Sequence, residues 1–135
     1  MSVSLHGNIL VIDDNTVFRT ILAARLRLEG LEVLEAESAD DGLEILHQRR
    51  FDLILLDMLM PNRDGLEVYQ ELRADDFMRR LPVIMMTEMA VDTHWETLAY
   101  ESDGPSFVMG KPADMHIFVD HVSNVLRSLP GVDGR

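Results

Sequence analysis

The sequence predicts an α/β fold, a doubly wound parallel sheet of five strands with helices on both faces. Three observations support this prediction. Short apolar runs alternate five times with segments whose apolar residues recur at helical spacing. The run over residues 53–56 is apolar without interruption, which indicates a strand covered on both faces. Gly30, Gly65 and Pro82 stand at the ends of these segments, where breaks between elements are expected.

The first two strand–helix units lie in the N-terminal part of the chain. The run NILVID (8–13) is the first strand, and apolar residues recur at helical spacing over 16–29 until Gly30 ends that helix. The second strand is LEVLEAE (31–37), and the second helix runs from residue 39 to about residue 48.

The remaining units continue the alternation. The third strand is DLILLD (52–57), and its helix begins near Gly65, a residue that suits a tight turn at the end of the preceding loop. The fourth strand is PVIMMT (82–87), and a weaker helical pattern surrounds Trp95. The fifth unit comprises the strand SFVMG (106–110) and the clearest helical stripe, over residues 115–129.

Composition limits the class of protein. A chain of 135 residues with 47% hydrophobic residues predicts one domain over 1–135, with a core of about 8–129. No run approaches the roughly 18–20 apolar residues of a membrane span, and the N-terminus lacks a secretory signal pattern. The absence of cysteine excludes disulfides and thiol chemistry. We therefore expect a cytoplasmic protein without membrane contact, and its net charge of -12 disfavours direct nucleic-acid binding.

Polar residues collect where the predicted strands end. Asp13 and Asp14 end the first strand, Asp57 the third and Thr87 the fourth, while Lys111 follows the fifth. In a parallel sheet these ends meet at one edge, where α/β proteins bind their ligands. Each residue alone has a plainer explanation, such as a helix cap for Asp14. Three clustered carboxylates, however, raise one another's pKa unless a cation lies among them.

Mg²⁺ is the cation that this set of oxygen ligands favours, because it is typically bound by one or two carboxylates together with phosphate and water. A carboxylate beside Mg²⁺ suits phosphoryl chemistry, and aspartate is a known covalent acceptor of phosphate. We therefore expect Asp57 to be the nucleophile. Thr87 can donate a hydrogen bond to a phosphoryl oxygen, and Lys111 can pair with another.

These motifs together resemble the receiver domain of two-component response regulators. The resemblance covers residues 8–128 and rests on the pair DD at 13–14, LLDMLMPNRDG at 55–65, Thr87 after an apolar strand, and Lys-Pro at 111–112. It implies a flavodoxin-like strand order 2-1-3-4-5, an order for which a receiver protein is a standard example. The family also implies a phosphoacceptor that is not an enzyme acting on a separate substrate.

The resemblance assigns roles to individual residues. Asp57 takes a phosphoryl group from the phosphohistidine of a sensor histidine kinase or a phosphotransfer protein. Mg²⁺ is held by Asp14 and Asp57, by Asp13 through water, and by the backbone carbonyl of Leu59. The bond between Lys111 and Pro112 is expected to be cis, which X–Pro sequences permit.

Three departures from the family pattern concern regulation. Glu88 follows Thr87 where a small residue is usual, and its charge is expected to slow phosphorylation. Val108 stands where many relatives carry a switching aromatic residue, and valine is too stiff to replace it. The stretch from Thr87 to Lys111 is about two residues longer than usual. We therefore expect phosphorylation to act through a backbone movement of the segment after Thr87. The fluorescence of Trp95, which lies in that segment, would report the movement.

The favoured function is a single-domain phosphoacceptor that switches its binding to an unidentified downstream protein, although PGVDGR at the end could also be a linker within a longer regulator. Three alternatives remain at this point. The chain could be a receiver-like interaction module that is not phosphorylated, or an aspartyl-phosphate phosphotransferase or phosphatase acting on a small substrate. A nucleotide or flavin binder is disfavoured because the first strand–helix loop, DDNT, is acidic and lacks glycine.

Overall fold

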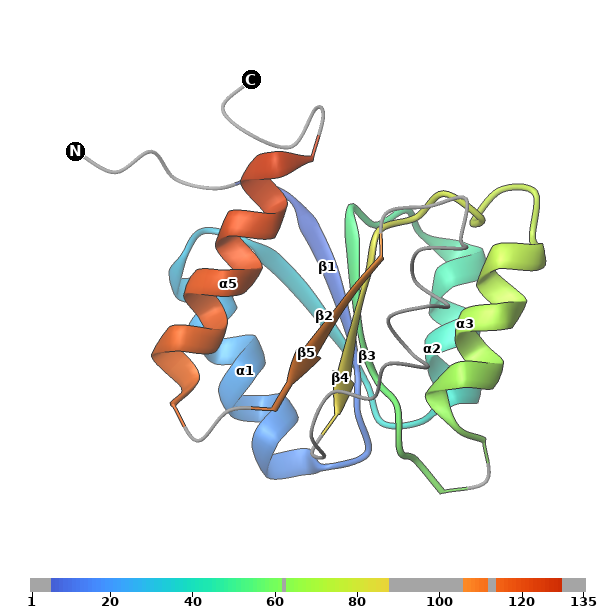
Figure 1. The fold of residues 1–135 in the computed structure, drawn as a ribbon, viewed down its shortest axis with the longest axis horizontal. Helices are drawn as coiled ribbons and strands as arrows, with labels where there is room; N and C mark the ends of the chain where they lie inside the picture. Colours follow the sequence, from blue (N-terminus) through green and yellow to red (C-terminus); the bar gives the residue numbers. More distant parts are fainter. Residues whose placement is uncertain (1–5, 62, 88–105, 112–113, 130–135) are drawn as a thin grey trace.

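Five parallel strands form the centre of the fold in the order β2-β1-β3-β4-β5 (Figure 1). The structure, a computed structural model, describes residues 6–61, 63–87, 106–111 and 114–129. The strands are β1 (Asn8–Ile12), β2 (Glu32–Ala36), β3 (Leu53–Asp57), β4 (Val83–Thr87) and β5 (Ser106–Gly110). The described helices are α1 (Thr16–Leu28), α2 (Ala39–Gln48), α3 (Gly65–Ala74) and α5 (Met115–Ser128). The predicted fold class and strand order are confirmed.

Two apolar layers cover the sheet, one on each face. Figure 1 shows α1 and α5 together on one side of the strands and α2 and α3 on the other. Successive residues of a strand point to opposite faces, so Ile9 packs with the α1/α5 layer and Leu10 with the α2/α3 layer. The same alternation places Phe107 on the α1/α5 side and Val108 on the α2/α3 side, as the sequence predicted.

Each described helix begins with a side chain that accepts a hydrogen bond from a backbone N–H of its first turn. These capping residues are Asn15, Ser38, Asp64 and Asp114. Because Asn15 caps α1, the explanation of Asp14 as a helix cap is excluded, and Asp14 is available for another role. Gly30, which follows α1, has a φ of 96°, a conformation that glycine adopts without strain.

The ends of several elements differ from the prediction by one residue. β1 ends at Ile12 rather than at residue 13, because Asp13 makes only one further backbone hydrogen bond, to the carbonyl of Ala36 at 3.0 Å, before the chain turns. β2, β3 and β4 each begin one residue later than predicted, α1 ends at Leu28, and α5 ends at Ser128. The weaker helical pattern around Trp95 lies outside the described residues. Within the described part of the chain, no helix is long and apolar enough to cross a membrane.

Candidate phosphoacceptor site

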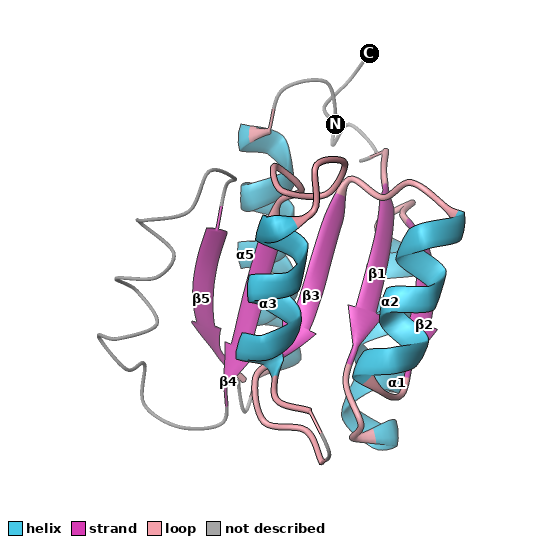
Figure 2. Cartoon of the chain, turned by 90° about the vertical axis from the view of Figure 1, so that its right-hand side faces the viewer, coloured by secondary structure: helices cyan, strands magenta, loops and turns pink. Residues whose placement is uncertain are grey.

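The carboxyl ends of the strands lie at one edge of the sheet, toward which the arrowheads in Figure 2 point. Asp13 directly follows β1, Asp57 is the last residue of β3, and Thr87 is the last residue of β4. Lys111 follows β5, and its backbone N–H donates to the carbonyl of Thr87 at 2.6 Å. The structure therefore brings together side chains from four segments that are far apart in the sequence.

Asp13 is fully buried, and the start of α1 holds it in place. Its Oδ1 accepts a hydrogen bond from the backbone N–H of Asn15 at 2.8 Å. Its backbone carbonyl accepts a hydrogen bond from Nη1 of Arg19 at 2.7 Å, and Nε of Arg19 lies 3.2 Å from Oε1 of Glu35. One carboxylate oxygen and the backbone of Asp13 are thus fixed, which leaves Oδ2 directed at the site.

Lys111 supplies a buried positive charge. Its Nζ lies 2.8 Å from Oδ2 of Asp13 and 3.5 Å from Oδ1 of Asp57, and its side chain is only 7% exposed. The 2.8 Å contact with Oδ2 of Asp13, a buried oxygen, is a buried ion pair. The ammonium also lies 4.7 Å from the centre of the Phe18 ring, a favourable cation–π contact.

The environment of Asp57 disfavours its charged form. The pKa of Asp57 is raised from 3.8 to about 7. Burial is the largest cause, and the charge of Asp13 and a hydrogen bond with Asp14 act in the same direction. The charge of Lys111 and the backbone N–H of Leu59, which donates to Oδ1 at 3.3 Å, act in the opposite direction. Without a further cation, the site therefore favours the protonated form of Asp57 more than water does.

The three carboxylates form a group that fits a hard divalent cation. Asp13, Asp14 and Asp57 can each present an oxygen so that the three atoms lie within 4.8 Å of one another. Asp13 and Asp57 are buried, whereas Asp14 is exposed and leaves the group open to solvent. One ammonium cannot balance three ionised carboxylates, and oxygen ligands with an open side are typical of Mg²⁺ sites.

Comparison with known proteins identifies the family. Residues 9–123 match the family described as the response regulator receiver domain. The chain belongs to this family. It is 34% identical to the transcriptional regulatory protein AfsQ1 of Streptomyces coelicolor over 120 residues, which cover 89% of this chain and 51% of that protein. The chain spans about half or less of the length of the curated relatives that it matches.

Solved receiver structures share the fold. The N-terminal domain of a response regulator receiver protein from Methanoculleus marisnigri has a TM-score of 0.71 and 28% identity, and the match covers 91% of this chain and 98% of that one. Chemotaxis protein CheY4 of Vibrio cholerae has a TM-score of 0.79 over 90% of this chain and 99% of its own. At 22% identity, the second likeness concerns the fold alone.

The other residues that the sequence singled out lie as follows in this receiver domain. Val108 is half-buried against the α2/α3 layer, on the face predicted for it. Leu59 directs its backbone N–H at Asp57, while the metal-binding role of its carbonyl stays a prediction. Glu88 and Pro112, and with Pro112 the predicted cis bond, lie outside the described residues.

Gly65 has a different role from the one predicted. It does not serve a turn that needs a positive φ, since only Gly7 and Gly30 have one among the described residues. A Cβ at this position would instead lie 2.5 Å from the carbonyl oxygen of Asp57 and 2.6 Å from Cα of Met58. Gly65 therefore allows the start of α3 to pass close to the backbone of Asp57 and Met58.

Sequence reasoning missed two supporting residues of the receiver site. Phe18 was counted only as part of the apolar face of α1, but its ring also contacts Lys111. Arg19 carried no signal in the linear pattern, because its partners are a backbone carbonyl and a side chain on β2. Only the packing of α1 against the sheet reveals these two contacts.

Proposed function

We propose that Asp57 accepts a phosphoryl group from the phosphohistidine of a sensor histidine kinase or a phosphotransfer protein, and that phosphorylation changes the binding of a downstream protein. The observation that carries this proposal is the group of three carboxylates, Asp57 among them, beside a buried lysine. In this proposal residues 1–135 act as one receiver domain.

Asp57 reacts as a carboxylate. One of its oxygens forms a bond to phosphorus as the P–N bond of the donor breaks, and the imidazole leaves with the bonding electron pair and takes up a proton. Asp13, Asp14 and Asp57 are the residues that would hold Mg²⁺. When bound, Mg²⁺ supplies positive charge that favours ionised Asp57 and offsets the negative charge of the phosphoryl oxygens.

Lys111 and Thr87 assist the transfer in this proposal. Lys111 already lies between Asp13 and Asp57, so its ammonium can pair with a phosphoryl oxygen without moving far. Thr87 ends the neighbouring strand and is nearly buried, and its hydroxyl can donate a hydrogen bond to a second oxygen. Both groups stabilise the added charge, which favours the phosphorylated state.

The product is a modified protein rather than a released small molecule. Receiver domains of response regulators are generally not enzymes in the ordinary sense. Phosphorylation adds up to about two negative charges to a buried site, which can bias neighbouring loops between two arrangements. The net charge of -12 supports a protein as the downstream partner of this domain rather than nucleic acid.

Phosphorylation with a small donor tests the proposal. Phosphoramidate carries a P–N bond like that of phosphohistidine, so incubation with it and Mg²⁺ should add the mass of one phosphoryl group. Asp57→Asn should remain unmodified, whereas Asp76→Asn, which removes an exposed carboxylate from the turn before β4, should gain the same mass as the wild type. The assignment is wrong if Asp57→Asn is still modified, or if chelation of Mg²⁺ leaves the rate unchanged.

A further inference from the structure

A groove of about 660 Å³ lies at the opposite edge of the sheet from the phosphoacceptor site. One wall is the end of α2 and the chain that enters β3, and the other is the turn that precedes β4. Both strands begin here, so the groove is at their amino ends. We call it the basic groove, after the residues that line it, which include His47, Arg49, Arg50, Phe51, Phe77 and Arg80.

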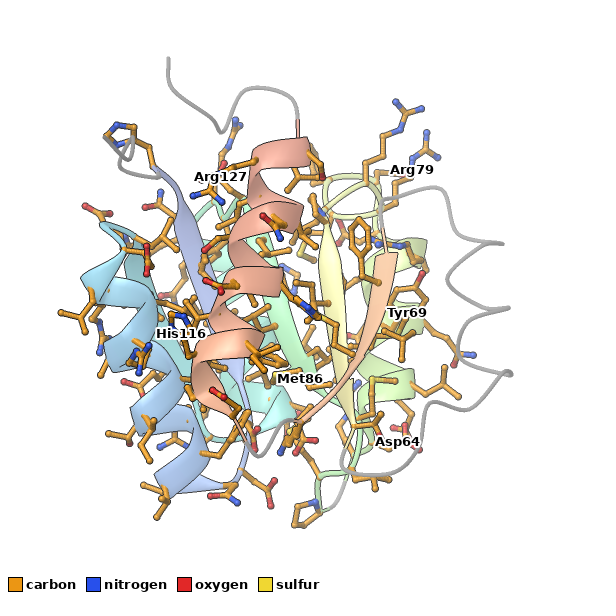
Figure 3. All side chains as sticks on the ribbon, turned by 60° about the vertical axis from the view of Figure 1, so that its left-hand side comes forward. Asp64, Tyr69, Arg79, Met86, His116 and Arg127 are labelled. Carbon is orange, nitrogen blue, oxygen red and sulfur yellow. The ribbon has the colours of Figure 1, made fainter. Side chains whose placement is uncertain are left out.

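The charge of the basic groove is opposite to that of the chain as a whole. The sequence has 24 acidic and 12 basic residues, yet the described residues that line this groove include three arginines and no carboxylate. None of Arg49, Arg50 and Arg80 forms an ion pair with a residue that the structure describes, and neither does the adjacent Arg79. Figure 3 shows Arg79 at the end of the molecule away from Asp64, the residue that caps α3 near the acidic site.

An aromatic side chain stands at the rim of the basic groove. Phe77 is 97% exposed, although large apolar side chains are usually buried. The backbone of this turn is held in place, because Oδ1 of Asp75 accepts hydrogen bonds from the backbone N–H groups of Phe77 at 2.8 Å and Met78 at 3.1 Å. Met78 is itself buried in the α2/α3 layer and anchors the turn. The turn thus presents Phe77 to solvent on a fixed support.

We propose that the basic groove binds an acidic segment of a partner protein that also carries an apolar side chain. The arginines would pair with its carboxylates, and Phe77 and the half-buried Phe51 would contact its apolar side chain. Arginine and aromatic residues are the types that contribute most to protein–protein binding. A pre-ordered turn also reduces the entropy lost when the segment binds.

The charge of the chain favours a short segment over a long polyanion. A nucleic acid or an anionic membrane would extend beyond the groove and meet the negative charge of the remaining surface. A segment that fits within the groove is attracted by the local arginines and ends before that surface. The basic groove is also separated from Asp57 by the length of the strands, so the segment can stay bound during phosphorylation.

Binding of a defined peptide tests this inference. The probe is a short fluorescein-labelled peptide in which glutamate alternates with phenylalanine, and the control peptide has glutamine in place of glutamate. Fluorescence anisotropy at low salt should show binding of the acidic peptide that weakens as salt is added. Arg80→Glu and Phe77→Ser should each weaken binding by about tenfold. Arg127→Glu, an equal charge change on α5, should leave binding within about twofold of the wild type.

Several outcomes would overturn the inference. Equal binding of the two peptides would show that charge is not recognised, and equal losses in Arg80→Glu and Arg127→Glu would show that only net charge matters. Stronger binding of ATP than of the acidic peptide, lost in Arg80→Glu, would assign the groove to nucleotides instead. Because Phe77 is exposed, Phe77→Ser should fold like the wild type, which a thermal melt checks. Asp57→Asn should bind the peptide normally whether or not Asp57 is the phosphoacceptor.

Discussion

Asp57→Asn is expected to stabilise the folded protein at neutral and alkaline pH in the absence of metal. Asparagine has nearly the shape of aspartate, and its carbonyl can still accept the backbone N–H of Leu59. Its amide can donate to Asp14, whereas two ionised carboxylates cannot share a hydrogen bond. The substitution therefore removes a buried charge without leaving a cavity.

The pKa of Asp57 determines the size and the pH range of the effect. That pKa is raised from 3.8 to about 7, so between these values the folded state binds more protons than the unfolded state. The stability of the wild type therefore falls as pH rises through this range. Each pH unit is worth about 1.4 kcal/mol, so the full effect is at most about 4 kcal/mol and is reached above pH 7. Coupling with Asp13 and structural relaxation lower the expected gain to about 2–4 kcal/mol.

Denaturant unfolding with a chelator present, from pH 4.5 to pH 8.5, measures this effect. The difference in free energy of unfolding between variant and wild type should be small at the acid end, grow with pH, and level off above about pH 7. Other titrating groups act on both proteins and largely cancel in the difference. A difference that does not change with pH would refute the reasoning, because it would mean that Asp57 titrates alike in the folded and unfolded states.

Three further substitutions test separate parts of the site. Lys111→Met should lower the free energy of unfolding at neutral pH by about 3 kcal/mol, because the buried Asp13 loses its ion-pair partner, and Mg²⁺ should restore part of the loss. Unchanged stability would contradict this. Gly65→Ala should lower the free energy of unfolding by about 2–3 kcal/mol, since the new Cβ meets backbone atoms. Gly42→Ala is its matched comparison and should cost less than Gly65→Ala, because its Cβ would meet side-chain atoms of Ile12, which can shift, rather than backbone atoms; equal losses would disprove the distinction. Asp14→Ala should abolish Mg²⁺ binding in calorimetric titration without lowering metal-free stability, because Asp14 is exposed. Retained affinity would remove Asp14 from the ligand set.

The fold was largely predictable because its main determinants are local. Apolar runs and helical spacing depend on neighbouring residues, and capping residues such as Ser38 and Asp64 act within one turn. The convergence of Asp13, Asp57 and Lys111 then follows from geometry, because strands that run parallel must end at the same edge. The polar residues at the strand ends could therefore be grouped before any coordinates were known.

Contacts that depend on how helices pack could not be predicted in this way. The ring of Phe18 lies beside Lys111, and Arg19 reaches the carbonyl of Asp13, only because α1 lies across the end of β1 at a particular angle. Gly65 was assigned to a turn because a sequence shows local conformation and not the close approach of two backbones. The basic groove likewise joins two segments whose charges are unremarkable when each is read separately.

The raised pKa of Asp57 links the stability of the site to its proposed chemistry. If a carboxylate is already ionised in the metal-free protein, a bound cation changes its protonation very little. Mg²⁺ binding would then make little difference to its reactivity as a nucleophile. A buried carboxylate held among like charges has the opposite property, because a cation lowers its pKa and removes a repulsion at the same time. Lys111 relieves only part of that repulsion, since one ammonium faces three carboxylates. Bound Mg²⁺ is therefore expected to increase the ionised, nucleophilic fraction of Asp57, so that a phosphoryl donor encounters an ionised acceptor more often when the cation is in place.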